Sequence, residues 1–195
     1  MTEKVKIKDL VRLLTADRSI RRFDESRKIE RATLEELTGL TRLCASGRNA
    51  QALRYRIVTG TDCERVFPHL KWAGYYKDWD GPEVGQRPVA YLVQCVDTEI
   101  AHNVLCDDGI QLQAITLGAT TLGIGCCIIK AFDAAKIAES LRIAPRYKPQ
   151  YVLALGFPAE TARIVEMADD GDFKYFRDEN DVQCVPKRPL RELIM

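Results

Sequence analysis

The amino-acid sequence predicts one α+β domain over residues 1–195. Three observations support this prediction. Segments with the periodicity of helices alternate with short apolar runs that are typical of strands. One long, mostly apolar helical segment lies in the middle of the chain. The sequence contains no internal repeat, low-complexity tract or linker-like stretch that would divide it.

Five segments have a helical pattern. They cover residues 6–16, about 33–47, 61–68, 103–122 and 134–141. The second and third contain the spacing of a capping box, at Thr33 and Glu36 and at Thr61 and Glu64, which predicts that helices begin there. Asp133 can cap the last helix. The segment 103–122 is apolar on so many sides that we expect it to be buried centrally or at a subunit interface.

Four short apolar runs predict strands, at residues 55–59, 89–96, 126–129 and 151–156. Two further regions have neither pattern. Residues 71–88 contain both tryptophans, three glycines and two prolines, which favours a functional loop or a partly helical lid. The roughly forty residues after Phe157 show little periodicity, so we expect a tail that either dangles or wraps around something.

The composition argues against several classes of protein. With 29 Lys and Arg against 28 Asp and Glu, the net charge of +1 gives no general attraction to nucleic acid or to an anionic membrane. The apolar runs are far shorter than the roughly 18 residues of a membrane-spanning helix. No signal peptide is recognisable, so we expect a cytoplasmic protein.

The seven cysteines also favour a reduced, metal-free protein. They form no CxxC pair, and only two histidines are present to complete a ligand set, so no metal site is expected. Cys126 and Cys127 are adjacent in a predicted strand, where neighbouring side chains point to opposite faces. We therefore expect two buried thiols in preference to a redox pair.

Three polar segments are candidates for chemistry, because the sequence has no phosphate loop, dinucleotide fingerprint, HExxH or GxSxG motif. RSIRRF at 18–23 combines arginines with a serine, and PKRP at 186–189 is a second basic cluster. Residues of these types suit a phosphate. A solvated basic surface is the alternative. In ASGRNAQ at 45–51, two amide side chains suit the edge of a flavin or pyrimidine-like ring, and the alternative is an ordinary loop.

Taken in order, RSIRRF, ASGRNAQ, LGIGCCII and the C-terminal DGDFKYFRDEN…VPKRPLRELI resemble the nitroreductase family of FMN-dependent oxidoreductases. The resemblance covers nearly the whole chain, and WAGYYKDWDGPEVGQRPVAYLV resembles a short-chain subgroup. It implies a nitroreductase-like α+β fold with a central, mostly antiparallel sheet flanked by helices. It also implies a homodimer in which a C-terminal extension wraps the partner, with two FMN sites at the interface.

The resemblance implies a set of cofactor-binding residues. They are Arg18, Ser19, Arg21, Asn49, Gln51, Gly125, Lys187 and Arg188. The phosphate and ribityl chain would be held by the basic clusters, the flavin edge by the two amides of the partner subunit, and the ring face would lie close to Gly125. Arg21 is the candidate catalytic residue, as a cation that stabilises the anionic reduced flavin.

The sequence departs from the family pattern at two places. Asp17 precedes Arg18 where many members have a second basic residue. Ala52 and Leu53 follow Gln51 where many members read NxQPW, so the substrate cannot be carried over.

The resemblance implies an enzyme that takes a hydride from NADH or NADPH and passes two electrons to a small acceptor by a ping-pong mechanism. The acceptor would be a nitroaromatic, a quinone or a similar molecule, selected by residues 71–88. Two other functions stay open. One is a flavin-binding carrier or sensor without nicotinamide turnover. The other is an interaction protein whose basic residues, Arg21, Arg22, Lys187 and Arg188, meet an acidic partner.

Overall fold

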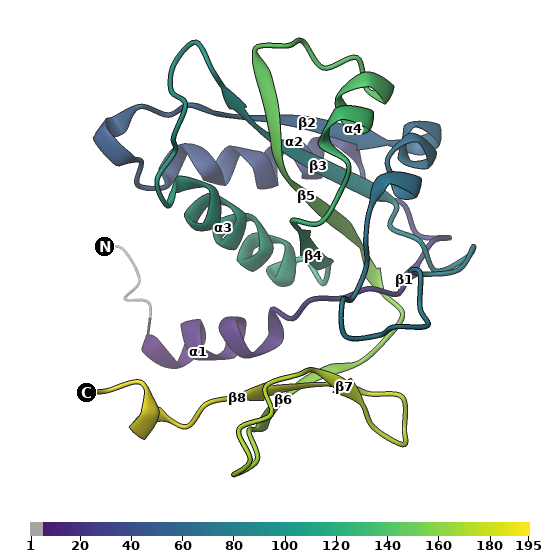
Figure 1. Ribbon diagram of the computed structural model, residues 1–195, viewed down its shortest axis with the longest axis vertical. Helices are drawn as coiled ribbons and strands as arrows, with labels where there is room; N and C mark the ends of the chain where they lie inside the picture. Colours follow the sequence, from purple (N-terminus) through teal and green to yellow (C-terminus); the bar gives the residue numbers. More distant parts are fainter. Residues whose placement is uncertain (1–5) are drawn as a thin grey trace.

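The computed structural model describes residues 6–195 as a central antiparallel sheet with helices on both faces (Figure 1). The sheet consists of β1 (Phe23–Asp24), β2 (Leu53–Thr59), β3 (Ala90–Asp97), β4 (Gly125–Ile129) and β5 (Tyr147–Pro158). The order is β1-β5-β3-β2, and β4 also pairs with β5. Every pairing is antiparallel. The predicted α+β fold with a mostly antiparallel sheet is therefore confirmed.

Two apolar layers sandwich the sheet. The helices are α1 (Ile7–Ala16), α2 (Arg31–Gly39), α3 (Asp107–Thr121) and α4 (Ala134–Ser140). On one face α2 and α3 pack against apolar residues of β3, β4 and β5. On the other face α4 and the segment around Trp72 do the same. Because both faces are covered, every residue of β3 is buried.

The sheet strands and α4 agree with the sequence predictions. Each predicted strand is present, and β5 extends the predicted run at both ends. The carboxylate of Asp133 accepts the backbone N–H of Lys136 at 3.1 Å, so the predicted cap of α4 is confirmed. No helix or strand occurs within residues 71–88, which confirms an irregular segment there.

The helix starts predicted from the two capping boxes were wrong. The first helix they predicted, α2, begins at Arg31 after an extended Glu30, with no side-chain cap at its start. Past Gly39 the chain tightens into a 3₁₀ turn, η1 (Leu40–Leu43), so the helix ends well before Gly47. The second box falls inside another 3₁₀ turn, η3 (Gly60–Arg65), again without a side-chain cap. The remaining 3₁₀ turns are η2 (Gly47–Asn49), η4 (Phe67–His69) and η5 (Leu190–Glu192).

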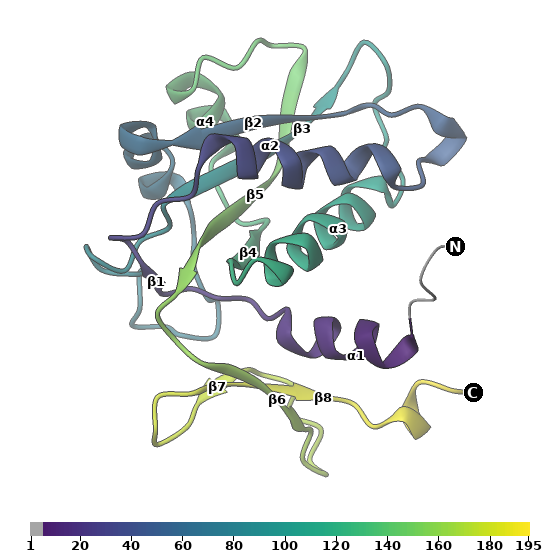
Figure 2. The ribbon, with the colours of Figure 1, turned by 180° about the vertical axis from the view of Figure 1, so that it is seen from behind.

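The C-terminal tail forms a second sheet. Its strands are β6 (Ala162–Glu166), β7 (Phe176–Arg177) and β8 (Gln183–Lys187), with β8 in the middle. β6 runs parallel to β8, whereas β7 runs antiparallel to it. This small sheet lies next to α1 in both views, so the C-terminal tail folds back beside the first helix (Figures 1 and 2). The sequence did not predict these strands.

Within residues 6–195, none of the helices has both the length and the apolar content that a membrane-spanning helix needs. No group of three or more His, Cys, Asp or Glu side chains in this range is arranged to hold a metal ion.

Candidate functional site

A small pocket of about 230 Å³ lies where the end of α1 meets α3, β4 and β8. Its lining residues are Asp17, Arg18, Ser19, Gln113, Thr116, Cys126, Ile128 and Lys187. The chain after α1 is extended and runs along β4, because the N–H of Ile20 donates to the carbonyl of Cys126 at 2.8 Å. Lys187, the last residue of β8, lies at the same pocket. The fold therefore joins the two basic clusters that the sequence singled out.

The donors in this pocket fit a phosphate group. Arg18 uses one guanidinium nitrogen to donate to the carbonyl of Leu14 at 2.6 Å, while its buried Nε has no hydrogen-bond partner among the residues described. Within residues 6–195, neither Arg18 nor Lys187 forms an ion pair. Two cations, an orphaned N–H and an exposed serine hydroxyl are the donors that phosphate oxygens require.

Arg188 does not line this pocket. Its guanidinium pairs with Glu192 at 2.9 Å on the surface of the last turn, and both side chains are well exposed. The structure thus brings Lys187 to Arg18 and Ser19, and directs its neighbour elsewhere.

Asp17 places a negative charge in the same pocket. Its Oδ2 accepts from the hydroxyl of Thr116 and from the amide of Gln113, each at 2.6 Å. Both partners lie on α3, so the carboxylate is tied to a helix that is packed against the sheet.

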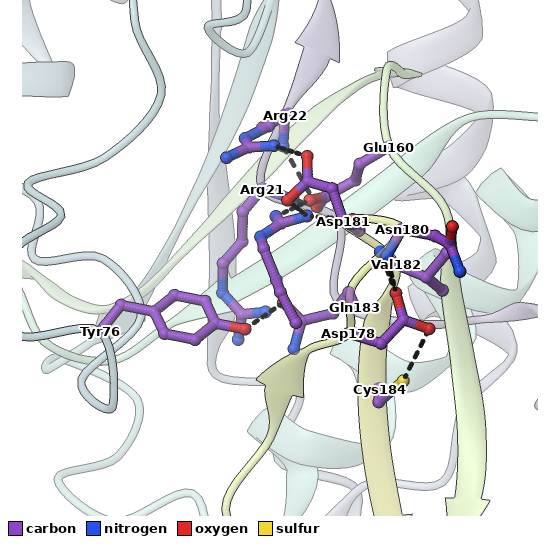
Figure 3. Close-up of polar contacts among 11 residues, drawn as sticks. Arg21, Arg22, Tyr76, Glu160, Asp178, Asn180, Asp181, Val182, Gln183 and Cys184 are labelled. Carbon is purple, nitrogen blue, oxygen red and sulfur yellow. Dashed lines mark hydrogen bonds and ion pairs between the residues drawn. The ribbon is translucent and has the colours of Figure 1, made fainter.

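Arg21 lies outside the pocket, in a buried polar cluster beneath the tail sheet (Figure 3). Only 9% of it is exposed, and its guanidinium lies 4.5 Å from the centre of the Tyr175 ring. Its Nε, like that of Arg18, has no partner among the described residues. A buried cation with an unused donor is suited to an anionic group, and the action of Arg21 on a flavin ring stays a prediction.

Glu160 organises the cluster around Arg21, and sequence reasoning missed it. One carboxylate oxygen accepts the backbone N–H of Arg21 and, at 3.2 Å, that of Arg22 (Figure 3). The other oxygen pairs with Arg177. The side chain of Glu160 is only 2% exposed. No local signal identifies it, because its partners in RSIRRF lie 138 and 139 residues earlier in the chain.

The irregular segment 71–88 is fastened to the tail over this cluster. The hydroxyl of Tyr76 donates to Gln183 at 2.7 Å (Figure 3), and burial raises the pKa of this tyrosine. Its ring meets that of Tyr175 edge-on, with centroids 5.4 Å apart. Trp72 and Trp79 pack edge-on behind it. Whether the segment selects a substrate stays a prediction.

Cys126 and Cys127 point to opposite faces of β4, as expected. Cys126 belongs to the apolar layer beneath α3, and Cys127 to the layer that contains Trp72. Burial raises the pKa of both thiols, which keeps them protonated and unreactive.

Gly125 is closely packed. A side-chain Cβ at this position would come within 2.8 Å of Ile20 and 3.0 Å of Pro158. The close approach of the RSIRRF segment to β4 is therefore one reason for glycine here, and contact with a flavin ring stays a prediction.

Asn49 and Gln51 occupy a strained loop away from the pocket. Arg48, Asn49 and Gln51 all have φ between 51° and 55°, a region that non-glycine residues rarely adopt. The buried carboxylate of Asp107 holds the loop by accepting from the hydroxyl of Ser46 at 2.6 Å and the N–H of Gly47 at 2.8 Å. Sequence reasoning missed this contact also.

Within one chain these amides do not reach the phosphate-like pocket. Asp107 begins α3, whereas the pocket is lined by Gln113 and Thr116, six and nine residues further along the same helix. At 1.5 Å per residue, this places the loop and the pocket roughly 9–14 Å apart along the helix axis. A contribution of the amides to this pocket would have to come from a second copy of the chain.

Comparison with known proteins identifies the family. Among protein-family models, the one described as the nitroreductase family matches residues 14–157, more than half of the chain. The chain belongs to the nitroreductase family. A search of the curated proteins finds no match.

Several solved structures share the fold of this chain. One is a protein from Desulfovibrio desulfuricans named as a nitroreductase and solved in complex with FMN, with 19% identity, a TM-score of 0.69 and coverage of 99% of this chain and 97% of that one. A nitroreductase family protein from Streptococcus pneumoniae has 15% identity, a TM-score of 0.68 and coverage of 95% and 98%. A Parabacteroides distasonis protein named as an NADH dehydrogenase/NAD(P)H nitroreductase has 19% identity, a TM-score of 0.65 and coverage of 80% and 90%.

Proposed function

We propose that this chain is an FMN-dependent oxidoreductase that uses NADH or NADPH to reduce a small acceptor, such as a nitroaromatic or a quinone, by a ping-pong mechanism. The observation that carries the proposal is the pocket in which Arg18, Ser19 and Lys187 present unused donors to a phosphate-sized space. The FMN-bound D. desulfuricans relative, which shares the fold over nearly its whole length, gives independent support.

FMN, when bound, would supply the redox chemistry by accepting a hydride and then giving up two electrons. The residues of the chain bind and orient it. Arg18, Ser19 and Lys187 would hold the phosphate. Arg188 would join them by leaving Glu192, which costs little because the pair is exposed.

Other residues would act on the flavin ring. The buried charge of Arg21 would stabilise the electron-rich reduced ring, which supports its assignment as the catalytic residue. The chain near Gly125 would face the ring. Asn49 and Gln51 would hydrogen-bond its edge from the partner subunit.

We also propose a homodimer in which the C-terminal segment wraps the partner. Helix α1 presents Ile7, Leu10, Val11 and Leu14 on one exposed side and buries none of its residues. Leu190, Leu193 and Ile194 are equally exposed near the C-terminus. Obligate interfaces of this apolar kind usually bury more than roughly 2,000 Å². We propose a cytoplasmic location as well, which the seven free thiols support.

An absorbance spectrum tests the function. The purified chain should show flavin absorption, acid should release FMN and no FAD, and anaerobic NADH or NADPH should bleach the spectrum. A protein that stays colourless and does not take up added FMN contradicts the proposal. Binding of FMN without bleaching by either nucleotide would instead identify a flavin carrier or sensor.

Light scattering tests the dimer. At low micromolar concentration the FMN-loaded protein should have twice the chain mass of 22.1 kDa. A stable FMN-loaded monomer would contradict the proposed interface.

A further inference from the structure

We propose that Asp17 is a specificity-determining residue which weakens the hold of this pocket on a phosphate, so that its charge reduces the preference for FMN over riboflavin. The inference rests on the proposed function and deepens it. It concerns the affinity and exchange of the flavin, and it is independent of the acceptor that the enzyme reduces.

The position of Asp17 is unfavourable for an acid. It is the C-cap of α1, where its N–H bonds to the carbonyl of Leu13 at 2.8 Å. A helix carries partial negative charge at this end, so a carboxylate there is repelled, and this repulsion is only partly offset by the Arg18 guanidinium, which donates to the carbonyl of Leu14 at 2.6 Å. Helix stability therefore does not account for an aspartate at this place.

The carboxylate of Asp17 is held in the pocket. Its two 2.6 Å hydrogen bonds come from neutral groups, the Thr116 hydroxyl and the Gln113 amide, so they orient the charge without cancelling it. Thr116 is buried against the apolar layer of the sheet, which leaves its hydroxyl little freedom to follow a moving partner. Within residues 6–195 no cation forms an ion pair with Asp17.

Asp17 lowers the positive charge that the pocket offers to a phosphate. A phosphate monoester carries about −1.5 to −2 charges at pH 7. Arg18 and Lys187 together would match it, but Asp17 in the same lining cancels one of their charges, and it lowers the total by the same amount when Arg188 joins them. The phosphate must bind next to a like charge, and this repulsion is absent for riboflavin, which has no phosphate.

The experiment compares two ligands on two proteins. Full-length protein freed of flavin is titrated with FMN and with riboflavin, and the quenching of flavin fluorescence gives each dissociation constant. In Asp17→Asn the amide oxygen keeps the hydrogen bonds from α3 while the charge is lost. We expect FMN to bind about tenfold more tightly to this variant, with riboflavin changed less than twofold. Inorganic phosphate, as a competitor of FMN, should have a correspondingly lower inhibition constant for the variant.

Two controls keep the result interpretable. Glu139→Gln removes one exposed carboxylate of α4 and makes the same change in net charge, so it should leave both affinities unaltered. If Asp17→Asn does not fold, Asp17→Ser also removes the charge and should show the same gain in affinity for FMN alone.

Three results would overturn the inference. Unchanged affinities for both FMN and riboflavin in Asp17→Asn would show that the carboxylate does not act on the phosphate. Equal weakening of both flavins would assign Asp17 to the ribityl hydroxyls. In both cases the proposed function stands, because flavin still binds. Failure of wild type and variant alike to bind either flavin would instead refute the proposed function, and this inference with it.

Discussion

The two halves of the RSIRRF segment differ in what their arginines contact. In the first half, Arg18 and Ser19 line a pocket and keep donors unused. In the second half, the backbone of Arg21 and Arg22 is tied to the buried Glu160, and the side chain of Arg22 pairs with Asp181 at 2.5 Å. Arginines within five residues of one another thus line a pocket in one place and are tied to acids of the C-terminal tail in the next.

The difference arises from what each half lies against. The first half follows the end of α1 and faces the pocket beside α3. The second half lies beneath the tail sheet, where Arg177 of β7 and the flanking acids Glu160 and Asp181 form a network of ion pairs around it. A cluster of basic residues in a sequence therefore does not define a binding site until the acids that face it are known.

The largest effect is expected where Glu160 fastens the second half. Glu160→Ala removes the acceptor of two N–H groups and leaves Arg177 without its buried partner. Breaking a buried pair in this way costs about 3–5 kcal/mol, so urea denaturation should show a loss of this size in the free energy of unfolding. Glu166→Ala, at an exposed position of β6, is the control and should change it by less than about 0.5 kcal/mol. A similar small loss for both variants would contradict the anchoring role.

The next effect concerns the rate of flavin reduction. If the charge of Arg21 stabilises the reduced ring, Arg21→Ala saturated with FMN should be reduced on the order of 100-fold more slowly by NADPH, with a lower reduction potential. Stopped-flow absorbance measures the rate. Arg22→Ala is the matched control, since it loses a partly exposed pair with Asp181 and should be reduced at the parent rate. Slow reduction of Arg22→Ala together with normal reduction of Arg21→Ala would exchange the two roles.

Sequence reasoning succeeded where the determinants are local. The cap of α4 depends on Asp133 and Lys136, three residues apart, and the opposite orientations of Cys126 and Cys127 follow from strand geometry alone. The two capping boxes failed because their spacing is also local but competes with packing: α2 begins two residues before Thr33, and the chain tightens to 3₁₀ geometry at Leu40.

The missed residues depend on contacts that are distant in the sequence. Glu160 acts on residues 138 and 139 positions away, and Asp107 holds a loop that lies 60 and 61 positions earlier. The tail strands were missed for a different reason. β6 and its partner β8 are short and themselves contain polar residues, so the apolar alternation that marks a strand is weak in both.

Substitutions at the pocket that the first half lines should lower the affinity for FMN and leave the free energy of unfolding unchanged. Arg18→Ala and Lys187→Ala each remove a charge-assisted contact, worth about 1.5–3 kcal/mol, so FMN should bind about 10- to 150-fold more weakly. Fluorescence titration measures this, and turnover at saturating FMN should stay close to that of the parent. Arg31→Ala, which removes only an exposed helical pair with Glu35, is the control. Equal losses for FMN and riboflavin would place these cations away from the phosphate.

The smallest effect is a loss of free energy of unfolding on acidification, and it arises in the turn that carries Asp181. Asp178 accepts the backbone N–H groups of Val182 at 2.9 Å and Asn180 at 3.0 Å, and these bonds, with Arg163 nearby, lower its pKa below 3.8. The folded protein thus holds this proton less readily than the unfolded chain, in which the pKa of Asp is about 3.9. The stabilisation is complete above that value and is lost as the pH falls through the lower pKa of the folded state.

Urea denaturation at pH 6 and at pH 3 tests this dependence with Asp178→Asn. The variant should be less stable than the parent at pH 6, because an amide accepts these hydrogen bonds more weakly than a carboxylate. The difference should shrink at pH 3, because the unfolded parent, whose Asp has a pKa of about 3.9, has taken up most of its proton there. Asp169→Asn, at an exposed position before the turn, should give the same small difference at both pH values. A gap between parent and Asp178→Asn that stays constant from pH 6 to pH 3 would mean that the ionised form of Asp178 does not hold this turn, and that Asp181 reaches Arg22 without its help.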